Sequence, residues 1–388
     1  MSSRSSFIVV GAGVIGCSLA DELSRRGHAV ALIDAGEAAS GTSAATFAWI
    51  NANSKSPDEY RQLNYLGLQA HERASALGAR WFHQTGMLQV AASGDEASQL
   101  ERNVSNAALP AYGARMLTRS EVLELEPGID PDVVVAGAVY PREGWLDVPT
   151  MCASLLEHSI ARGAQYFPFE KVVGLDGSIV RTVAADGTER SHTANAVIIA
   201  AGNGTPSIAR SAGLDFPLID PEGNADAAGS PGASVGIISS TGPVAFGPRH
   251  FVRATGIAVR PARNGGVTFA DHPTGGMWGI NDPEIWSVPN LLLERVRRLY
   301  PSLREASTES VSLGKRVLPE DGLTIADWID PANRIYAIGT HSGVTLSAHL
   351  ATVVADEVTG GGRHESLERF ALHRFNSAAT HGVKAPAR

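Results

Sequence analysis

Residues 7–16 read Phe-Ile-Val-Val-Gly-Ala-Gly-Val-Ile-Gly, a short apolar run followed at once by three glycines in the spacing G-x-G-x-x-G. A helical pattern follows over residues 17–26, and a second apolar run, 29–33, closes with Asp34. Dinucleotide-binding folds place an acid about 20 residues beyond the glycines, where it binds a ribose hydroxyl. The sequence therefore predicts a complete strand-turn-helix-strand unit for a dinucleotide.

The three glycines of this unit have different tasks. Gly11 permits the tight turn, Gly13 lets the backbone approach a pyrophosphate, and Gly16 lets the helix pack on the strand. The N-terminus of the following helix presents N–H groups and a positive dipole end to the phosphates. The alternative is a glycine-rich turn without a ligand. The residues expected to contact the dinucleotide here are Gly11, Ala12, Gly13, Val14, Ile15, Gly16, Asp34 and Ala35.

Length and composition indicate a folded protein of two domains. The chain has 388 residues, and single hydrophobic cores usually stop growing before about 250–300 residues. Its net charge is −8 and no basic run exceeds two residues, which argues against nucleic-acid binding. Its two cysteines, Cys17 and Cys152, form no CxxC pair, so redox chemistry would require a bound cofactor.

The N-terminus and the apolar segments bear on location. Residues 1–6 form a short polar leader with no signal-peptide pattern, and no apolar stretch approaches the roughly 18–20 residues of a membrane span. We therefore expect a cytoplasmic protein that does not insert into membranes. No metal site is expected.

The remaining patterns predict an α/β fold: a Rossmann-type nucleotide-binding domain into which a second, mainly antiparallel-sheet domain is inserted. The nucleotide-binding domain is expected to comprise residues 1–85, 145–215 and 310–388, and the substrate domain residues 86–144 and 216–309. Helices are predicted over 57–77, 95–108, 148–162, 289–299 and 345–359, with strands over 87–91, 133–139, 172–175, 196–201, 257–259, 267–269 and 334–338.

Four segments, in order, resemble the D-amino-acid oxidase, glycine oxidase and sarcosine oxidase superfamily of FAD enzymes. They are GAGVIG at 11–16, REGWLDVP at 142–149, VIIAAGNGTP at 197–206, and GKRVLPEDGL at 314–323 followed by YAIGTHSGVTLSAH at 336–349. The resemblance spans nearly the whole chain and agrees with the inserted-domain pattern. It implies that the dinucleotide is FAD.

The resemblance also implies further cofactor contacts. The segment after Asp34 runs along the cofactor, Val172 contacts the adenine side, and the helix that starts near Gly343 faces the flavin's pyrimidine edge. There a helix N-terminus would stabilise the negative charge of the reduced ring. No cysteine follows Cys152 and no histidine lies within 41–53, so non-covalent FAD is expected. The additional contact residues are Gly41, Thr42, Ser43, Ala45, Val172, Ala201, Gly202, Gly339, Ser342, Gly343, Val344 and Thr345.

Two residues are carried over from the family as catalytic candidates. Arg316 matches an arginine that binds the substrate carboxylate, and the alternative is a surface or interdomain ion pair. His341 lies in the turn that faces the flavin, and the alternative is a histidine hydrogen-bonded by neighbouring backbone. Four more residues lie on the predicted substrate sheet and are expected to point to solvent: His250, Arg253, Arg260 and His272.

The resemblance implies dehydrogenation of the C–N bond of a small amine or amino acid. Hydride would pass from carbon to flavin N5, and water would hydrolyse the resulting imine. The electron acceptor is oxygen or another compound, because no lysine between Lys171 and Lys315 matches the oxygen-activating lysine of sarcosine oxidase-like enzymes. One alternative is an FAD-binding electron-transfer subunit of a multi-chain dehydrogenase. Another, an NAD(P)H-dependent flavoenzyme, lacks a second complete G-x-G-x-x-G unit.

Overall fold

The fold is known from a computed structural model, which describes residues 5–106, 110–222, 235–271, 274, 276 and 278–377. A six-stranded sheet has the order β19-β20-β13-β1-β2-β9. All its neighbours pair in parallel except β19, which runs antiparallel to β20 at one edge. Its strands are β1 (Ser6–Val10), β2 (Ala29–Ile33), β9 (Gln165–Phe167), β13 (Ala196–Ile199), β19 (Ile325–Trp328) and β20 (Ile335–Gly339).

Helices cover one face of this sheet. Helix α1 (Val14–Arg25) joins β1 to β2 and packs between α5 (Val148–Ala161) and α9 (Gly343–Val358). Strands β1 and β13 are apolar and almost fully buried, as expected for parallel strands covered on both faces. The predicted strand-turn-helix-strand unit is confirmed.

The other face of the six-stranded sheet carries a small meander. Its strands are β10 (Glu170–Asp176), β11 (Ile179–Ala184) and β12 (Glu189–Thr193), and α6 (Thr205–Ser211) contacts β10. Another three-stranded sheet pairs β8 (Gly144–Leu146) with β3 (Trp49–Ile50) and β4 (Phe82–His83). Helix α2 (Asp58–Ala76) packs against α9.

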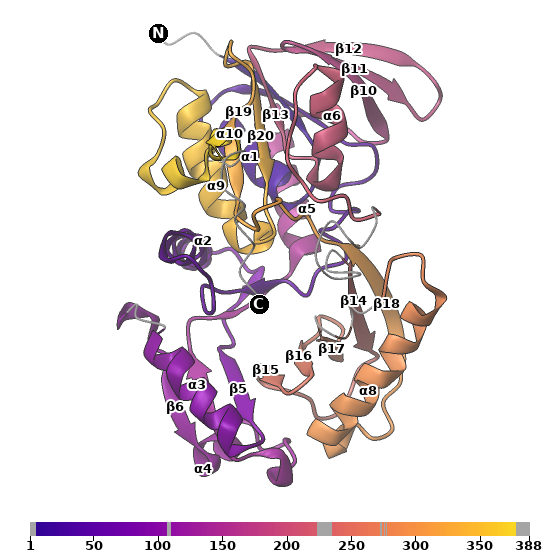
Figure 1. Ribbon diagram of the computed structural model, residues 1–388. Coiled ribbons are helices and arrows are strands. Elements are labelled where there is room, and N and C mark those ends of the chain that lie inside the picture. Colours follow the sequence, from indigo (N-terminus) through magenta and orange to yellow (C-terminus); the bar gives the residue numbers. More distant parts are fainter. Residues whose placement is uncertain are drawn as a thin grey trace.

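An eight-stranded sheet has the order β18-β14-β17-β16-β15-β5-β7-β6 and is antiparallel except where β15 meets β5. Figure 1 shows it in the lower part of the molecule, with α3, α4 and α8, below the six-stranded sheet. The strands are β5 (Met87–Ala91), β6 (Arg115–Thr118), β7 (Ala136–Tyr140), β14 (Val235–Thr241), β15 (Phe251–Ala254), β16 (Ile257–Pro261), β17 (Val267–Ala270) and β18 (Thr308–Lys315).

The remaining helices are short or lie on the eight-stranded sheet. The α-helices are α3 (Gly94–Asn106), α4 (Arg119–Leu125), α8 (Val288–Leu299) and α10 (Arg374–Ser377). The 3-10 helices are Pro110–Tyr112, Pro131–Val133, Gly202–Gly204, Pro283–Ser287, Pro301–Leu303 and Glu365–Phe370. Within the described ranges, no helix is both long enough and apolar enough to span a bilayer.

Two local predictions differ from the structure. The strand predicted over 133–139 begins only at Ala136, because the Asp130 side chain caps a 3-10 turn just before it. Strand β18 pairs with β14 in the eight-stranded sheet, although 310 was expected to begin the last segment of the nucleotide-binding domain. Its polar sequence, TESVSLGK, has no apolar alternation to mark a strand. The last two residues of the helix predicted over 95–108 lie outside the described residues.

Candidate active site

A cavity of about 1810 Å³ extends from the turn after β1 to the eight-stranded sheet. Sites for small ligands usually measure about 300–1,000 Å³. The volume is therefore sufficient for a dinucleotide together with a small substrate. The carboxyl end of β1 lies at this cavity, which is where α/β sheets bind ligands.

The glycine turn forms one end of the cavity through its backbone. Gly11 has φ +103°, and a Cβ there would lie 2.5 Å from the Ala200 carbonyl oxygen. At Gly16 a Cβ would lie 1.7 Å from the Gly11 carbonyl oxygen. Gly13 lines the cavity, and its backbone N–H precedes the first turn of α1. Any side chain at Gly11 or Gly16 would therefore force the strand and helix apart.

Asp34 lies at the end of β2 and connects the glycine turn to the next loop. Its Oδ2 accepts a hydrogen bond from the Ala12 N–H at 2.6 Å, and its Oδ1 accepts one from the Gly36 N–H at 2.8 Å. A carboxylate has about four acceptor positions. Asp34, which lines the cavity, can therefore still accept hydrogen bonds from ribose hydroxyls.

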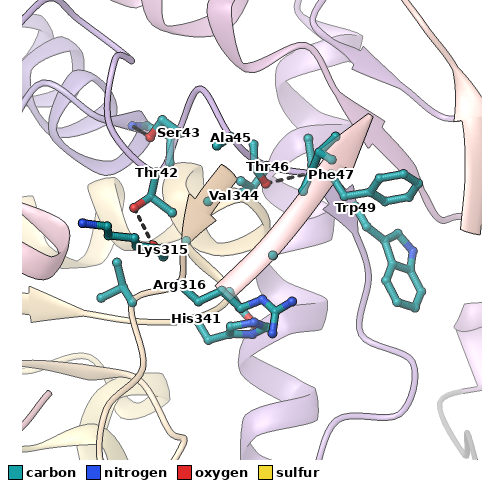
Figure 2. A pocket seen from close by; sticks show the side chains of 18 of the residues that line it. Thr42, Ser43, Ala45, Thr46, Phe47, Trp49, Lys315, Arg316, His341 and Val344 are labelled. Carbon is teal, nitrogen blue, oxygen red and sulfur yellow. Dashed lines mark hydrogen bonds between the residues drawn. The ribbon is translucent and has the colours of Figure 1, made fainter. Parts of the chain in front are cut away.

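The loop after β2 links both halves of the cavity. The Ser43 hydroxyl accepts a hydrogen bond from the Val14 N–H at 3.1 Å, at the first turn of α1. The Thr42 hydroxyl donates to the Lys315 carbonyl at 2.8 Å, which ties this loop to the end of β18 (Figure 2). The loop thus connects the glycine turn to the residue that precedes Arg316.

Helix α2 fixes the start of α9. A Cβ at Gly67 would lie 2.4 Å from the Thr345 carbonyl oxygen, so only glycine allows this close approach. Burial lowers the pKa of His71 to about 4, and the neutral ring hydrogen-bonds the Val344 carbonyl at 3.0 Å. The hydroxyls of Tyr60 and Ser342 are 2.8 Å apart. The N-terminus of α9 therefore faces the cavity in a rigid setting.

Most of the predicted site residues line this single cavity. Ala12, Gly16 and Gly339 do not, and they act through packing: a Cβ at Gly339 would lie 2.8 Å from the Phe216 ring. The residues that line the cavity are Gly11, Gly13, Val14, Ile15, Asp34, Ala35, Gly41, Thr42, Ser43, Ala45, Val172, Ala201, Gly202, Arg316, His341, Ser342, Gly343, Val344 and Thr345.

Arg316 and His341 come from different sheets and both line the cavity. Arg316 follows β18, and its guanidinium is 3.1 Å from the position that a Cβ of Gly236, in β14, would occupy. His341 follows β20, in the turn before α9. Figure 2 shows both side chains on the cavity lining, near the Lys315 backbone that binds Thr42.

The four remaining candidates on the substrate sheet have different positions. His250 hydrogen-bonds the buried Glu126 through Nδ1 at 2.7 Å and does not line the cavity. Arg260 is buried and donates to the Phe47 carbonyl at 2.9 Å. Arg253 lines the cavity. The expectation of solvent-facing side chains is wrong for these three, because each packs toward the protein or the cavity. His272 lies outside the described residues.

A buried acid lies behind the cavity wall. Glu143 is fully buried, and burial raises its pKa to about 7. Its carboxylate accepts hydrogen bonds from the Trp49 Nε1–H at 2.7 Å and from the Tyr112 hydroxyl. The positive charge of Arg253 acts in the opposite direction to burial and lowers the pKa. The network sets the position of the Trp49 ring at the cavity wall.

The wall between the two halves was not predicted from the sequence. Phe47, Trp49, Asn51 and Asn53 all line the cavity. They alternate along one extended segment, and this period of two is the signal that could have identified them. Lys55 also lines the cavity, with its Nζ 3.3 Å from the Ser342 hydroxyl.

The residues present fit FAD. The glycine turn leaves backbone N–H groups at a helix N-terminus for a pyrophosphate, Asp34 offers acceptors for a ribose, and the start of α9 offers N–H groups at the far end. Within the described ranges, no group of three His, Cys, Asp or Glu side chains is arranged to hold a metal ion.

Comparisons with known proteins agree with this geometry. Glycine oxidase from Geobacillus kaustophilus is 25% identical over 386 residues, which cover 96% of this chain and 98% of that protein. Its crystal structure has a TM-score of 0.78 at 22% identity and covers 95% of this chain and 99% of its own. An opine oxidase subunit from Agrobacterium tumefaciens is 24% identical, covering 95% and 97%. L-proline dehydrogenase from P. horikoshii has a TM-score of 0.78 at 18% identity, covering 97% and 99%.

Residues 6–357 match the family described as FAD dependent oxidoreductase, or DAO. The match includes the glycine turn, Asp34, the Arg316 segment and the start of α9. The chain therefore belongs to the DAO family of FAD-dependent oxidoreductases.

Proposed function

We propose that this enzyme dehydrogenates the C–N bond of a small amine or amino acid that carries a carboxylate. The observation that carries the proposal is one continuous cavity that joins the glycine turn and Asp34 to Arg316 and His341. Arg316 would bind the carboxylate through its planar guanidinium, which matches a carboxylate in a bidentate manner. The likeness to glycine oxidase and L-proline dehydrogenase supports this substrate class.

Bound FAD would accept the hydride from the amine carbon, the nitrogen lone pair would form the imine, and water would hydrolyse it. The protein would bind and orient the substrate and exclude water. The N–H groups at the start of α9 and the helix dipole would stabilise negative charge on the reduced cofactor. Oxygen or another acceptor would then take the electrons.

We propose that the FAD is held without a covalent bond. Both cysteines are buried, and neither lines the cavity. No histidine occurs in the loop at 41–53. Acid precipitation should therefore release the yellow cofactor into the supernatant, and flavin that stays with the pellet would contradict this.

An anaerobic screen tests the proposed reaction. The FAD-loaded protein is mixed with D- and L-amino acids, N-methyl amino acids and simple amines, and flavin absorbance is followed. Carboxylate-bearing amines should bleach the flavin. Absence of bleaching by every amine, or bleaching only by a reduced nicotinamide nucleotide, would contradict the proposal.

A second candidate is the FAD-binding subunit of a multi-chain dehydrogenase. The likeness to opine oxidase subunits along nearly the whole chain favours it. Under this alternative, the purified chain would bind FAD but would need a second chain for turnover. Purification from the native source with retention of a second chain, together with inactivity of the isolated chain, would support it.

A further inference from the structure

Arg253 lies on the face of the eight-stranded sheet that borders the cavity. In the sheet register it is opposite Ala258 of β16 and Gln89 of β5, and Ala258 is opposite Ala270 of β17. All four residues line the cavity, whereas the preceding residue, Val252, is fully buried on the opposite face. Strand alternation therefore directs Arg253 into the cavity.

The guanidinium of Arg253 lies over the Trp49 ring, 5.1 Å from its centroid. It forms no hydrogen bond and no ion pair with any residue that the structure describes. A guanidinium has five N–H donors. Those of Arg253 are therefore available to a ligand in the cavity.

The nearest acids attract Arg253 but are bound to other groups. Glu143 accepts from Trp49 and Tyr112, and Asp271 accepts from the Thr274 hydroxyl and N–H. Burial lowers the pKa of Arg253, while the charges of Glu143 and Asp271 raise it. A partly desolvated guanidinium is stabilised by a hydrogen-bonded anion.

Two neighbouring arginines show what a structural arginine looks like on this sheet. Arg260 donates to the carbonyls of Phe47 and Pro261. Arg295 donates to the Gly256 carbonyl at 2.6 Å and to the Thr274 hydroxyl at 2.7 Å. Arg253 has no comparable set of protein acceptors among the described residues.

Arg316 and Arg253 lie toward opposite edges of the same cavity floor. The Arg316 guanidinium lies against Gly236 of β14, and three strand steps separate β14 from β15, or about 14 Å between backbones. Between them the floor carries the small side chains of Ala258 and Ala270. The space suits an elongated ligand with an anionic group at each end.

We propose that Arg253 binds a second carboxylate, so that the substrate is an amine with two carboxylate groups. The inference rests on the proposed function, because Arg316 would bind the first carboxylate. The amine lies either between the two carboxylates, as in an N-(carboxyalkyl) amino acid, or on the carbon beside one of them, as in an acidic amino acid.

Ligand titration tests this without turnover. Straight-chain dicarboxylates from malonate to suberate, and the monocarboxylate of each length, are titrated into FAD-loaded protein while flavin absorbance is recorded. At least one dicarboxylate should bind about 10- to 150-fold more tightly than its matched monocarboxylate, the effect of one charge-assisted contact. Arg253→Met should abolish this preference and leave monocarboxylate affinity within about twofold of wild type.

Two further variants separate the alternatives. Arg249→Met removes the same charge from an exposed residue that does not line the cavity, so it should keep the preference. Arg253→Lys should retain part of it, because a point charge replaces the fork. A wild type without preference, or equal losses of both ligand classes in Arg253→Met, would overturn the inference.

Bleaching assays then locate the amine. Iminodiacetate and N-(1-carboxyethyl)alanine represent the first arrangement, and glutamate and 2-aminoadipate the second. Faster bleaching by either pair than by N-methylglycine or alanine, lost in Arg253→Met, supports the inference. If no amine bleaches the flavin while the dicarboxylate preference persists, the proposed function fails and the anion site stands. Bleaching by monocarboxylic amines alone would overturn the dicarboxylic substrate.

Discussion

The two halves of the cavity are built in different ways. Glycine and other small residues from a few short segments form the cofactor half, and they contribute mainly backbone groups. Long side chains from separate strands and loops form the substrate half, including Trp49, Arg253 and Arg316. Backbone contacts require particular glycines at particular spacings, whereas the substrate half depends on which side chains the sheets bring together. Changes in the first half should therefore affect FAD binding and folding, and changes in the second should affect the substrate.

The largest effect is expected for Gly16→Val. A Cβ at this position would lie 1.7 Å from the Gly11 carbonyl oxygen, so the helix and the turn would have to separate. We expect loss of FAD binding and a fall of at least about 3 kcal/mol in the free energy of unfolding. Flavin content and thermal unfolding measure these effects.

The matched control for this change is Gly94→Ala, because nothing lies within 4 Å of a Cβ there. It should alter the free energy of unfolding by no more than about 0.5 kcal/mol. A Gly16→Val protein with normal flavin content would show that the turn tolerates a side chain and that the cofactor half does not depend on this packing.

Arg316→Ala should act on the substrate half alone. Loss of a bidentate contact that also orients the reacting carbon should lower kcat/KM for a carboxylate substrate roughly 30- to 1,000-fold, or about 2–4 kcal/mol. Flavin content should stay near wild type. The corresponding amine without the carboxylate is the control substrate. Equal losses for both substrates, or loss of FAD, would make Arg316 a structural residue.

Glu143→Gln tests the acid behind the wall between the two halves. Burial raises the pKa of Glu143 from its ordinary value of 4.5 to about 7, so folding favours the protonated form. Its contribution to stability is most favourable below pH 4.5 and declines as the pH rises to 7. Relative to wild type, the variant should gain on the order of 3 kcal/mol across this window.

Denaturant unfolding of the FAD-loaded protein at several pH values measures this difference. The constant cost of the amide in place of the carboxylate, toward the donors Trp49 and Tyr112, is the same at every pH and does not obscure the slope. A difference between wild type and variant that does not change with pH would show that Glu143 titrates near its ordinary pKa.

The smallest effect is expected for Asp34→Ala. The carboxylate accepts from the Ala12 and Gly36 N–H groups and lines the cavity, so its loss should weaken FAD binding by about 1–3 kcal/mol. Titration of FAD into the apoprotein, followed by flavin fluorescence, measures this. Asp186→Ala, in an exposed hairpin, removes the same charge and should leave affinity unchanged. Equal affinity in both variants would exclude Asp34 from the cofactor site.

The sequence by itself determined the cofactor half. The spacing of Gly11, Gly13 and Gly16 after an apolar strand, with Asp34 at the end of the next strand, has a steric reason that is local to about 30 residues. The α/β fold and the FAD requirement could therefore be predicted before any contact was known. Even there, the packing role of Gly339 against Phe216 needed the structure, because the two residues are distant in sequence.

Only the tertiary structure decided the substrate half. Strand β18 has no apolar alternation, so its sequence did not reveal that it carries Arg316 to the cavity. The opposite fates of Arg253 and Arg260 depend on the partners opposite each strand position, since one meets the cavity and the other meets the Phe47 carbonyl. Arginines on one sheet are equivalent in a sequence. Strand register and the residues packed on each face decide which of them can bind a ligand.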